Sequence, residues 1–147
     1  MGDGGMLARV FAVAVAVNYP WELAQAPLYA PSMGWGAMLW HCGLASVGDG
    51  AMVLLIVVAG RLLLRRGDWF VRPGTRDRLV MLALGLALSV GVEWVALRGL
   101  GWWAYAPGMP LVPVLGVGVA PLLQMLALPP LIAHFATCAS RAGEERR

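Results

Sequence analysis

The stretch VFAVAVAVNYPWELAQAPLY, residues 10–29, decides how the chain folds. Its first eight residues are apolar, as at the start of a membrane helix, but Asn18, Glu22 and Gln25 then follow at spacings of four and three. Residues at i, i+4 and i+7 lie on one face of a helix. A helix in lipid can carry a carboxyl and two amides on one face only if that face meets other helices. The stretch therefore predicts a bundle with a polar interior.

The composition is that of an integral membrane protein. Of the 147 residues, 60% are hydrophobic and 13% are charged, and the mean hydropathy is +0.73, whereas a soluble domain carries about 25% charged residues. The length favours a single domain over residues 1–147. The net charge of +3 does not indicate nucleic-acid binding, because the arginines cluster at the ends of apolar segments. Cys42 and Cys138 lie in different apolar segments, so we expect no disulfide between them.

Four apolar segments are long enough to cross a bilayer, since a spanning helix needs about 20 residues. They cover residues 6–27, 35–64, 79–97 and 109–139. Lipid satisfies no backbone hydrogen bonds, so these segments must be helices. We therefore expect an all-α polytopic membrane protein with four transmembrane helices in an antiparallel bundle. Pro113, Pro121 and the pair Pro129-Pro130 predict that the fourth helix is kinked.

The first segment has an alternative interpretation as a signal peptide. Arg9 would precede its apolar core, and Ala24-Gln25-Ala26 resembles a cleavage motif. Pro27 would follow the cut directly, where a protease requires an extended chain with a free N–H. We therefore expect the first segment to be retained as a helix.

The arginines predict the orientation of the bundle. Six lie between residues 61 and 78, Arg9 lies near the N-terminus, and the tail contains Arg141, Arg146 and Arg147. The other two loops contain only Arg98. The positive-inside rule then places both termini and the loop 65–78 in the cytoplasm of a bacterium, with the protein in the inner membrane. Most Trp and Tyr residues fall near the opposite face, as in an aromatic belt, and only Trp69 falls on the inner side.

Polar residues recur inside the other three segments. The second segment carries His41 and Asp49, the third carries Glu93, and the fourth carries Gln124. Glu22, His41 and Glu93 each lie about 8 to 9 Å below the outer end of their helix at 1.5 Å per residue, so they are expected to form one layer. Asp49 and Gln124 lie deeper and are expected to bond to each other.

These residues are the candidate site. The candidate catalytic residues are Glu22, Glu93, His41 and Asp49; the candidate ligand-binding residues are Asn18, Gln25, Trp94, Trp103, Tyr105 and Gln124. Polar side chains also hold membrane helices together, and we favour that role for Asn18 and Gln124. His134, near the inner end of the fourth segment, is expected to be an interface residue.

Two chemistries are open to the layer of acids. Two carboxyls and an imidazole could hold zinc or iron, although the chain has no HExxH motif, and the metal is left unknown. A protonated carboxylic acid could instead protonate an olefin beside aromatic rings. No cofactor follows from the sequence, and whether the protein is an enzyme stays open.

Two resemblances extend this interpretation. The stretch GWWAYAPGMPLVP, residues 101–113, is similar to the Trp-x-Tyr and proline stretch of membrane lycopene cyclases, but the paired acidic motif that follows it in those enzymes is absent. The order WELAQAPLY, GDG, EW, WWAYAPGMP and PLLQ resembles small bacterial four-helix membrane proteins to which no activity is attached. The second resemblance implies the four-helix fold and no reaction.

The leading functional hypothesis is a polar site near the periplasmic face that binds or transforms a small apolar or lipid-like ligand. One alternative is a non-catalytic subunit of a larger membrane complex, and another is an ion or metal carrier that uses the same acids. The expected partners are membrane lipids and a further membrane protein or a second copy of the chain, but not nucleic acid.

The orientation gives a first prediction. In a background without Cys42 and Cys138, a single cysteine at Gly108 should react with a membrane-impermeant thiol reagent in spheroplasts or whole cells. A cysteine at Thr75 should react only after the membrane is opened, because the arginine-rich loop is cytoplasmic. Labelling of Thr75→Cys in intact cells, with Gly108→Cys protected, would reverse the orientation.

Overall fold

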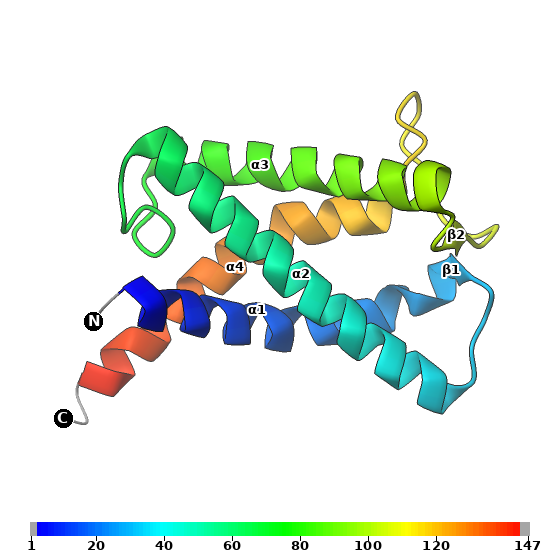
Figure 1. Ribbon diagram of the computed structural model, residues 1–147, viewed down its shortest axis with the longest axis horizontal. Coiled ribbons are helices and arrows are strands. Elements are labelled where there is room, and N and C mark those ends of the chain that lie inside the picture. Colours follow the sequence, from blue (N-terminus) through cyan, green and yellow to red (C-terminus); the bar gives the residue numbers. More distant parts are fainter. Residues whose placement is uncertain (1–2, 145–147) are drawn as a thin grey trace.

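The chain folds mainly into four helices, as Figure 1 shows for the computed structural model. The structure describes residues 3–144 and the side chains of residues 4–138, so the prediction for Arg141, Arg146 and Arg147 lies outside the described side chains. The helices are α1 (Asp3–Gln25), α2 (Trp35–Leu64), α3 (Thr75–Trp94) and α4 (Val119–Glu144). The expectation of a four-helix, mainly helical chain is confirmed.

Three helical stretches are long and apolar enough to cross a membrane. They are Trp35–Leu64, Thr75–Leu100 and Val119–Cys138. Helix α1 does not meet the same criterion over its described residues, because Arg9, Asn18 and Glu22 lower its hydropathy. Its polar face is thus visible in composition as well as in spacing.

The helix bounds agree with the sequence for α2 and differ elsewhere. Helix α1 passes into a 3₁₀ turn over Ala26–Leu28. Helix α3 begins earlier than expected, at Thr75, because the Asp77 carboxylate accepts the backbone N–H of Gly74 (2.9 Å) and caps the helix. It continues through a π-helical segment, Val95–Leu100, and ends at Gly101, whose φ of 62° is left-handed.

The expected fourth helix is wrong over residues 109–118. This segment forms a reverse turn in which Leu111 and Gly118 are bridged and the Val119 N–H donates to the Pro110 carbonyl (2.8 Å). Pro113 therefore interrupts no helix, and Pro121 lies in the first turn of α4, where a backbone N–H has no helical partner. Only Pro129 and Pro130 lie deep inside the helix.

Each helix packs on two others. Helix α1 packs on α2 and α4, and α3 packs on the same two helices. The apolar core lies between them toward the end where α1 begins and α4 finishes, around Val10, Ala14, Ile56 and Ile132. The loop that joins α2 to α3 is also at this end (Figure 1).

That loop contributes directly to the core. Trp69 and Phe70 are fully buried, and the Trp69 indole N–H donates to the Val57 carbonyl (3.0 Å). A Cβ on Gly60 would overlap the Trp69 ring. The sequence placed Trp69 at the inner membrane interface, but it is a core residue, because its loop folds back over α2.

A short β-ribbon joins the two loops at the other end of the molecule (Figure 1). Strand β1 (Tyr29–Ala30) pairs antiparallel with β2 (Ala104–Tyr105), so that Tyr29 faces Tyr105 in register. The Ala106 N–H extends the ribbon by donating to the Leu28 carbonyl (2.9 Å). This ribbon was not part of the all-α expectation, and it ties the α1–α2 loop to the α3–α4 loop.

The packing of α3 on α4 gives a second prediction. A Cβ on Gly85 would overlap the backbone carbonyl oxygen of Met125, which cannot turn aside as a side chain could. Gly85→Ala should therefore lower the free energy of unfolding by about 1–3 kcal/mol. The matched control is Gly91→Ala on the same helix, where a Cβ meets nothing within 4 Å; it should be neutral or stabilising. Equilibrium unfolding in mixed micelles measures both, and equal effects would contradict the close approach.

Candidate functional site

Gln124 is the centre of a buried polar cluster. Its Nε2 donates to Asn18 Oδ1, Glu22 Oε1 and Asp49 Oδ2, each at 2.8 Å. Its Oε1 accepts from Gln25 Nε2 (3.0 Å). The side chain is 2% exposed. One carboxamide on α4 therefore holds three residues of α1 and one of α2, with two N–H groups serving three acceptors.

The partners of Gln124 are themselves bonded. Gln25 Nε2 also donates to Glu22 Oε1 (2.6 Å), and Gln25 Oε1 accepts from the Trp21 indole (3.2 Å). Asn18 Nδ2 donates to the Ala14 carbonyl (2.8 Å). Within the described residues, every buried side-chain nitrogen and oxygen has a hydrogen-bond partner. The cluster is thus fully satisfied, as a polar group away from water requires.

The two acids of the cluster lie close together. Glu22 Oε1 and Asp49 Oδ2 accept from the same nitrogen, Gln124 Nε2, which brings the two carboxyl groups side by side. The expected bond between Asp49 and Gln124 is present. The expected separation of Glu22 into an outer layer is wrong, because the long Glu22 side chain reaches the same amide as Asp49.

Glu93 forms a second polar group, beneath the β-ribbon. Its Oε2 accepts from the Tyr105 hydroxyl and from the Trp103 indole (3.4 Å). The Tyr105 oxygen accepts in turn from the Gly118 N–H (2.7 Å). Burial raises the pKa of the Tyr105 phenol above its usual range, and the bond to Glu93 raises it further. Tyr105 therefore stays protonated at neutral pH and donates to the acid.

Tyr29 completes this aromatic group. Its ring packs against Tyr105 and Trp103, with centroids 5.6 and 6.4 Å apart. Burial raises the pKa of the Tyr29 phenol, and the nearby Glu93 adds to the rise. The loop residues Tyr29, Trp103 and Tyr105 thus surround one carboxyl that α3 supplies.

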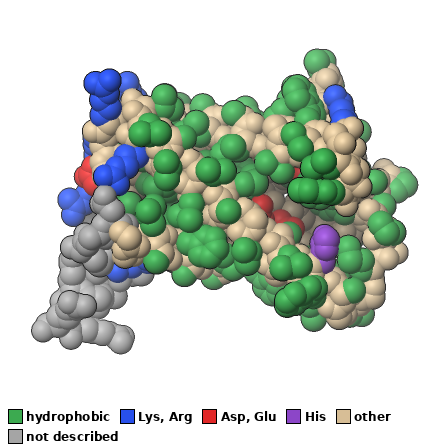
Figure 2. Space-filling view, viewed as in Figure 1, with side chains coloured by type: hydrophobic (Ala, Val, Ile, Leu, Met, Phe, Trp, Pro, Cys, Tyr) green, Lys and Arg blue, Asp and Glu red, His purple; other side chains and the backbone are tan. Residues whose placement is uncertain are grey.

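A cavity of about 1040 Å³ lies between the two polar groups. In Figure 2, acidic side chains and a histidine are visible in a hollow toward one end of a mostly apolar surface. Apolar and aromatic side chains form most of the wall, with Glu22, Asp49 and Glu93 among its polar members. The aromatic and sulfur-containing lining residues are Tyr29, Trp35, Trp102, Trp103, Met33, Met38, Met52, Met125 and Cys42.

The structure brings together most of the residues that the sequence proposed. Seven of them line the cavity: Glu22, Gln25, His41, Asp49, Glu93, Trp103 and Gln124. Asn18 and Tyr105 stand behind the wall, bonded to Gln124 and Glu93. Trp94 does not line the cavity: its indole donates to the Leu115 carbonyl (2.9 Å) and its ring packs under Arg98. Adjacent helix residues point about 100° apart, so Glu93 and Trp94 cannot share one site.

Glu22, His41 and Glu93, which the sequence left open as metal ligands, are not arranged to hold a metal ion in the described part of the chain. His41 lines the cavity but makes no hydrogen bond to Glu22 or Glu93 in the described part of the chain. No group of three His, Cys, Asp or Glu side chains among residues 4–138 is arranged to hold a metal ion. Among the described residues, Glu22, His41 and Glu93 thus line the same cavity but do not hydrogen-bond to one another as a single layer would.

Sequence reasoning missed Tyr29, Trp35 and Trp102 as lining residues. A signal for the first was present: Tyr-Ala-Pro-x-Met occurs at residues 29–33 and again at 105–109. The two copies lie in the two loops that pair, with Tyr29 opposite Tyr105. The repeat was therefore the sequence signal that related the two loops, although their pairing follows only from the structure.

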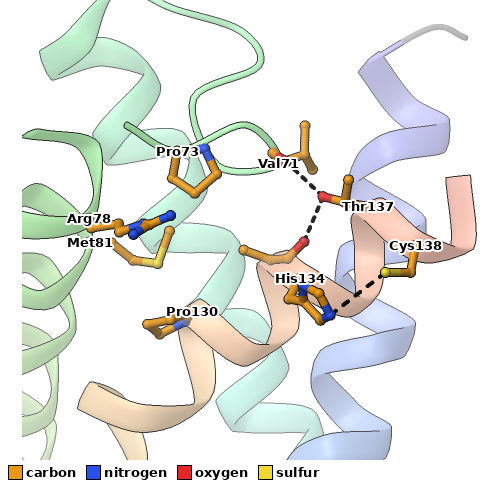
Figure 3. Close-up of a pocket in the computed structure, with 9 residues that line it drawn as sticks. Val71, Pro73, Arg78, Met81, Pro130, His134, Thr137 and Cys138 are labelled. Carbon is orange, nitrogen blue, oxygen red and sulfur yellow. Dashed lines mark hydrogen bonds between the residues drawn. The ribbon is translucent and has the colours of Figure 1, made fainter. Parts of the chain in front are cut away.

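A second, smaller cavity of about 400 Å³ lies at the opposite end, between α3, α4 and the α2–α3 loop (Figure 3). Thr137 Oγ1 donates to the Val71 carbonyl (2.7 Å), and the Cys138 sulfur lies 3.8 Å from His134 Nε2. His134 is exposed and lines this cavity, and its role as an interface residue stays a prediction.

Comparisons of the chain with models of protein families, with curated proteins and with solved structures found no match in any of the three.

The amide at the centre of the cluster gives a third prediction. Gln124→Leu removes four hydrogen bonds and leaves buried acceptors without donors, so it should lower the free energy of unfolding by about 1–3 kcal/mol. Asp49→Asn should cost less than about 1 kcal/mol, because the amide oxygen can still accept from Gln124. Leu123→Ala, next to Gln124 but half exposed, is the control. Equilibrium unfolding in mixed micelles measures these changes. If Gln124→Leu has the same midpoint of unfolding as the wild type, the amide does not hold the helices together.

Proposed function

We propose that the chain is a four-span inner-membrane protein that binds a small apolar or lipid-like ligand in the cavity near the β-ribbon. The observation that carries the proposal is a cavity of about 1040 Å³ with an apolar and aromatic wall on which a few polar side chains converge. Ligand sites in proteins have this character, with volumes of about 300–1,000 Å³.

The surface and the charges support a membrane location. Helix α2 exposes a series of large apolar side chains, among them Leu44, Leu55 and Leu62, which water would disfavour. Figure 2 shows most of the visible Arg side chains gathered at the end away from the hollow. The positive-inside rule would place that end in the cytoplasm and the cavity toward the periplasm. Helix α1 is then the fourth span, with its polar residues covered by α2 and α4.

The contacts favour binding over catalysis. Glu22, Asp49 and Glu93 each accept hydrogen bonds from amide, indole or phenol groups that are fixed by their own packing. Such bonds fix the position of each acid and satisfy the polar groups of a cavity that binds a ligand. The exposed Trp35 and Trp102 at the mouth suit residues that lie at the membrane interface.

A fourth prediction tests the cavity. Ala45 lines it, whereas Ala51 is exposed on the same helix and lies outside the lining. Ala45→Trp should project an indole ring into the cavity and reduce photolabelling by a long-chain alcohol that carries a diazirine by at least about fivefold, and Ala51→Trp should leave labelling unchanged. Mass spectrometry of the labelled protein should locate the label on lining residues such as Met38 and Met52.

Two outcomes would overturn the proposal. Labelling confined to the outer, lipid-facing side chains of α2 would mean that the cavity takes no apolar chain. If the two Trp variants are labelled equally and circular dichroism shows that both are folded, the cavity likewise takes no apolar chain.

A further inference from the structure

We infer that the ligand carries a positive charge on an apolar body, as a long-chain quaternary ammonium or protonated amine does. This inference rests on the proposed binding function and adds the chemical class of the ligand. It is carried by the acids and aromatic rings of the cavity wall.

The wall has acids and no arginine. Glu22, Asp49 and Glu93 line the cavity, and His41 is the one basic side chain among its lining residues. Arg98 is the nearest arginine by sequence to Glu93, but its guanidinium lies over the Trp94 ring (5.7 Å) and donates to the Leu115 carbonyl (3.3 Å). Among the described lining residues, the acids therefore have hydrogen-bond donors around them but no arginine or lysine beside them.

Glu22 and Asp49 place two acids side by side at the wall. Gln124 Nε2 holds Glu22 Oε1 and Asp49 Oδ2 together, and both residues line the cavity. Two adjacent carboxyls away from water are costly unless a proton or an opposite charge lies between or beside them. A ligand ammonium at the wall supplies that charge, which a neutral ligand cannot do.

The aromatic rings suit the same group. Tyr29, Trp102 and Trp103 line the cavity, and Trp103 lies at 85° to Tyr29 and 49° to Trp102. Its indole N–H is bonded to Glu93 (3.4 Å), which fixes the ring. Faces of Trp and Tyr within about 6 Å attract quaternary ammonium groups. Apolar wall residues such as Met38, Leu44 and Met52 would accompany the chain of the ligand.

An anionic amphiphile fits the cavity poorly. It would place its charge against three carboxyl groups with no guanidinium to offset them, and like charges in contact are unfavourable in a medium of low dielectric constant. The expected order of affinity is therefore cation, then neutral chain, then anion, at equal chain length.

The experiment compares three twelve-carbon compounds as competitors of the diazirine alcohol on the purified full chain in dodecylmaltoside. Dodecyltrimethylammonium should displace the photolabel at a concentration at least about tenfold lower than dodecanol, and dodecanoate should be weaker than dodecanol. The ammonium charge is permanent, so the comparison does not depend on ligand protonation. Asp68→Asn, an exposed loop acid outside the cavity, should leave the preference unchanged.

In the double variant Glu22→Gln, Asp49→Asn, dodecanol should still displace the photolabel. The concentrations of dodecanol and dodecyltrimethylammonium that displace it by half should then be nearly equal. Should the double variant not fold, the single variant Asp49→Asn should reduce the ratio of these two concentrations at least about threefold. If dodecanol and dodecyltrimethylammonium compete equally in the wild type, or if the preference survives these substitutions, the inference is wrong and the binding function stands. If no compound protects lining residues from the photolabel, the binding function itself is wrong.

Discussion

The arrangement of α1, α2 and α4 depends on the hydrogen bonds of the Gln124 carboxamide. This amide is the common partner of Asn18, Glu22, Gln25 and Asp49, and each of these bonds joins elements distant in the sequence. Leucine-like side chains can pack in lipid at many rotations of a helix, whereas an amide accepts only the rotations that place its partners within reach. The same amide that joins the helices also sets the spacing of the two acids at the cavity wall.

The two ends of the bundle are built differently. At the end with the arginines, Trp69 and Phe70 fold back from the α2–α3 loop and fill the space between the helices. At the other end, the ribbon of β1 and β2 holds the loops together but leaves the interior open as the larger cavity. Two glycines allow close contacts in the bundle: Gly85 of α3 lies against the Met125 backbone of α4, and Gly60 of α2 lies against Trp69 of the α2–α3 loop. The bundle is therefore close-packed at the end with the α2–α3 loop and open at the end with the β-ribbon.

Spacing and hydropathy predicted the parts of the structure that depend on one helix at a time. The bounds of α2, the shared face of Asn18, Glu22 and Gln25, and the pairing of Asp49 with Gln124 follow from helical period and depth. The turn at residues 109–118 did not, because its apolar composition is that of a helix while its conformation depends on the Leu111–Gly118 bridge and on backbone at positive φ. The direction of Trp94 and the burial of Trp69 depend on neighbours that no local pattern contains.

In the membrane location proposed above, the long sequence separation of the Gln124 bonds bears on how α1 would be inserted. Asn18 and Gln124 are 106 residues apart, so the polar face of α1 would lack its partner until α4 had been synthesised. Among the described helices, α1 is the one that is not apolar enough to be a candidate span. Its amides would then stay hydrated or held at the translocon until α4 arrived, so that α4 would complete the insertion of α1.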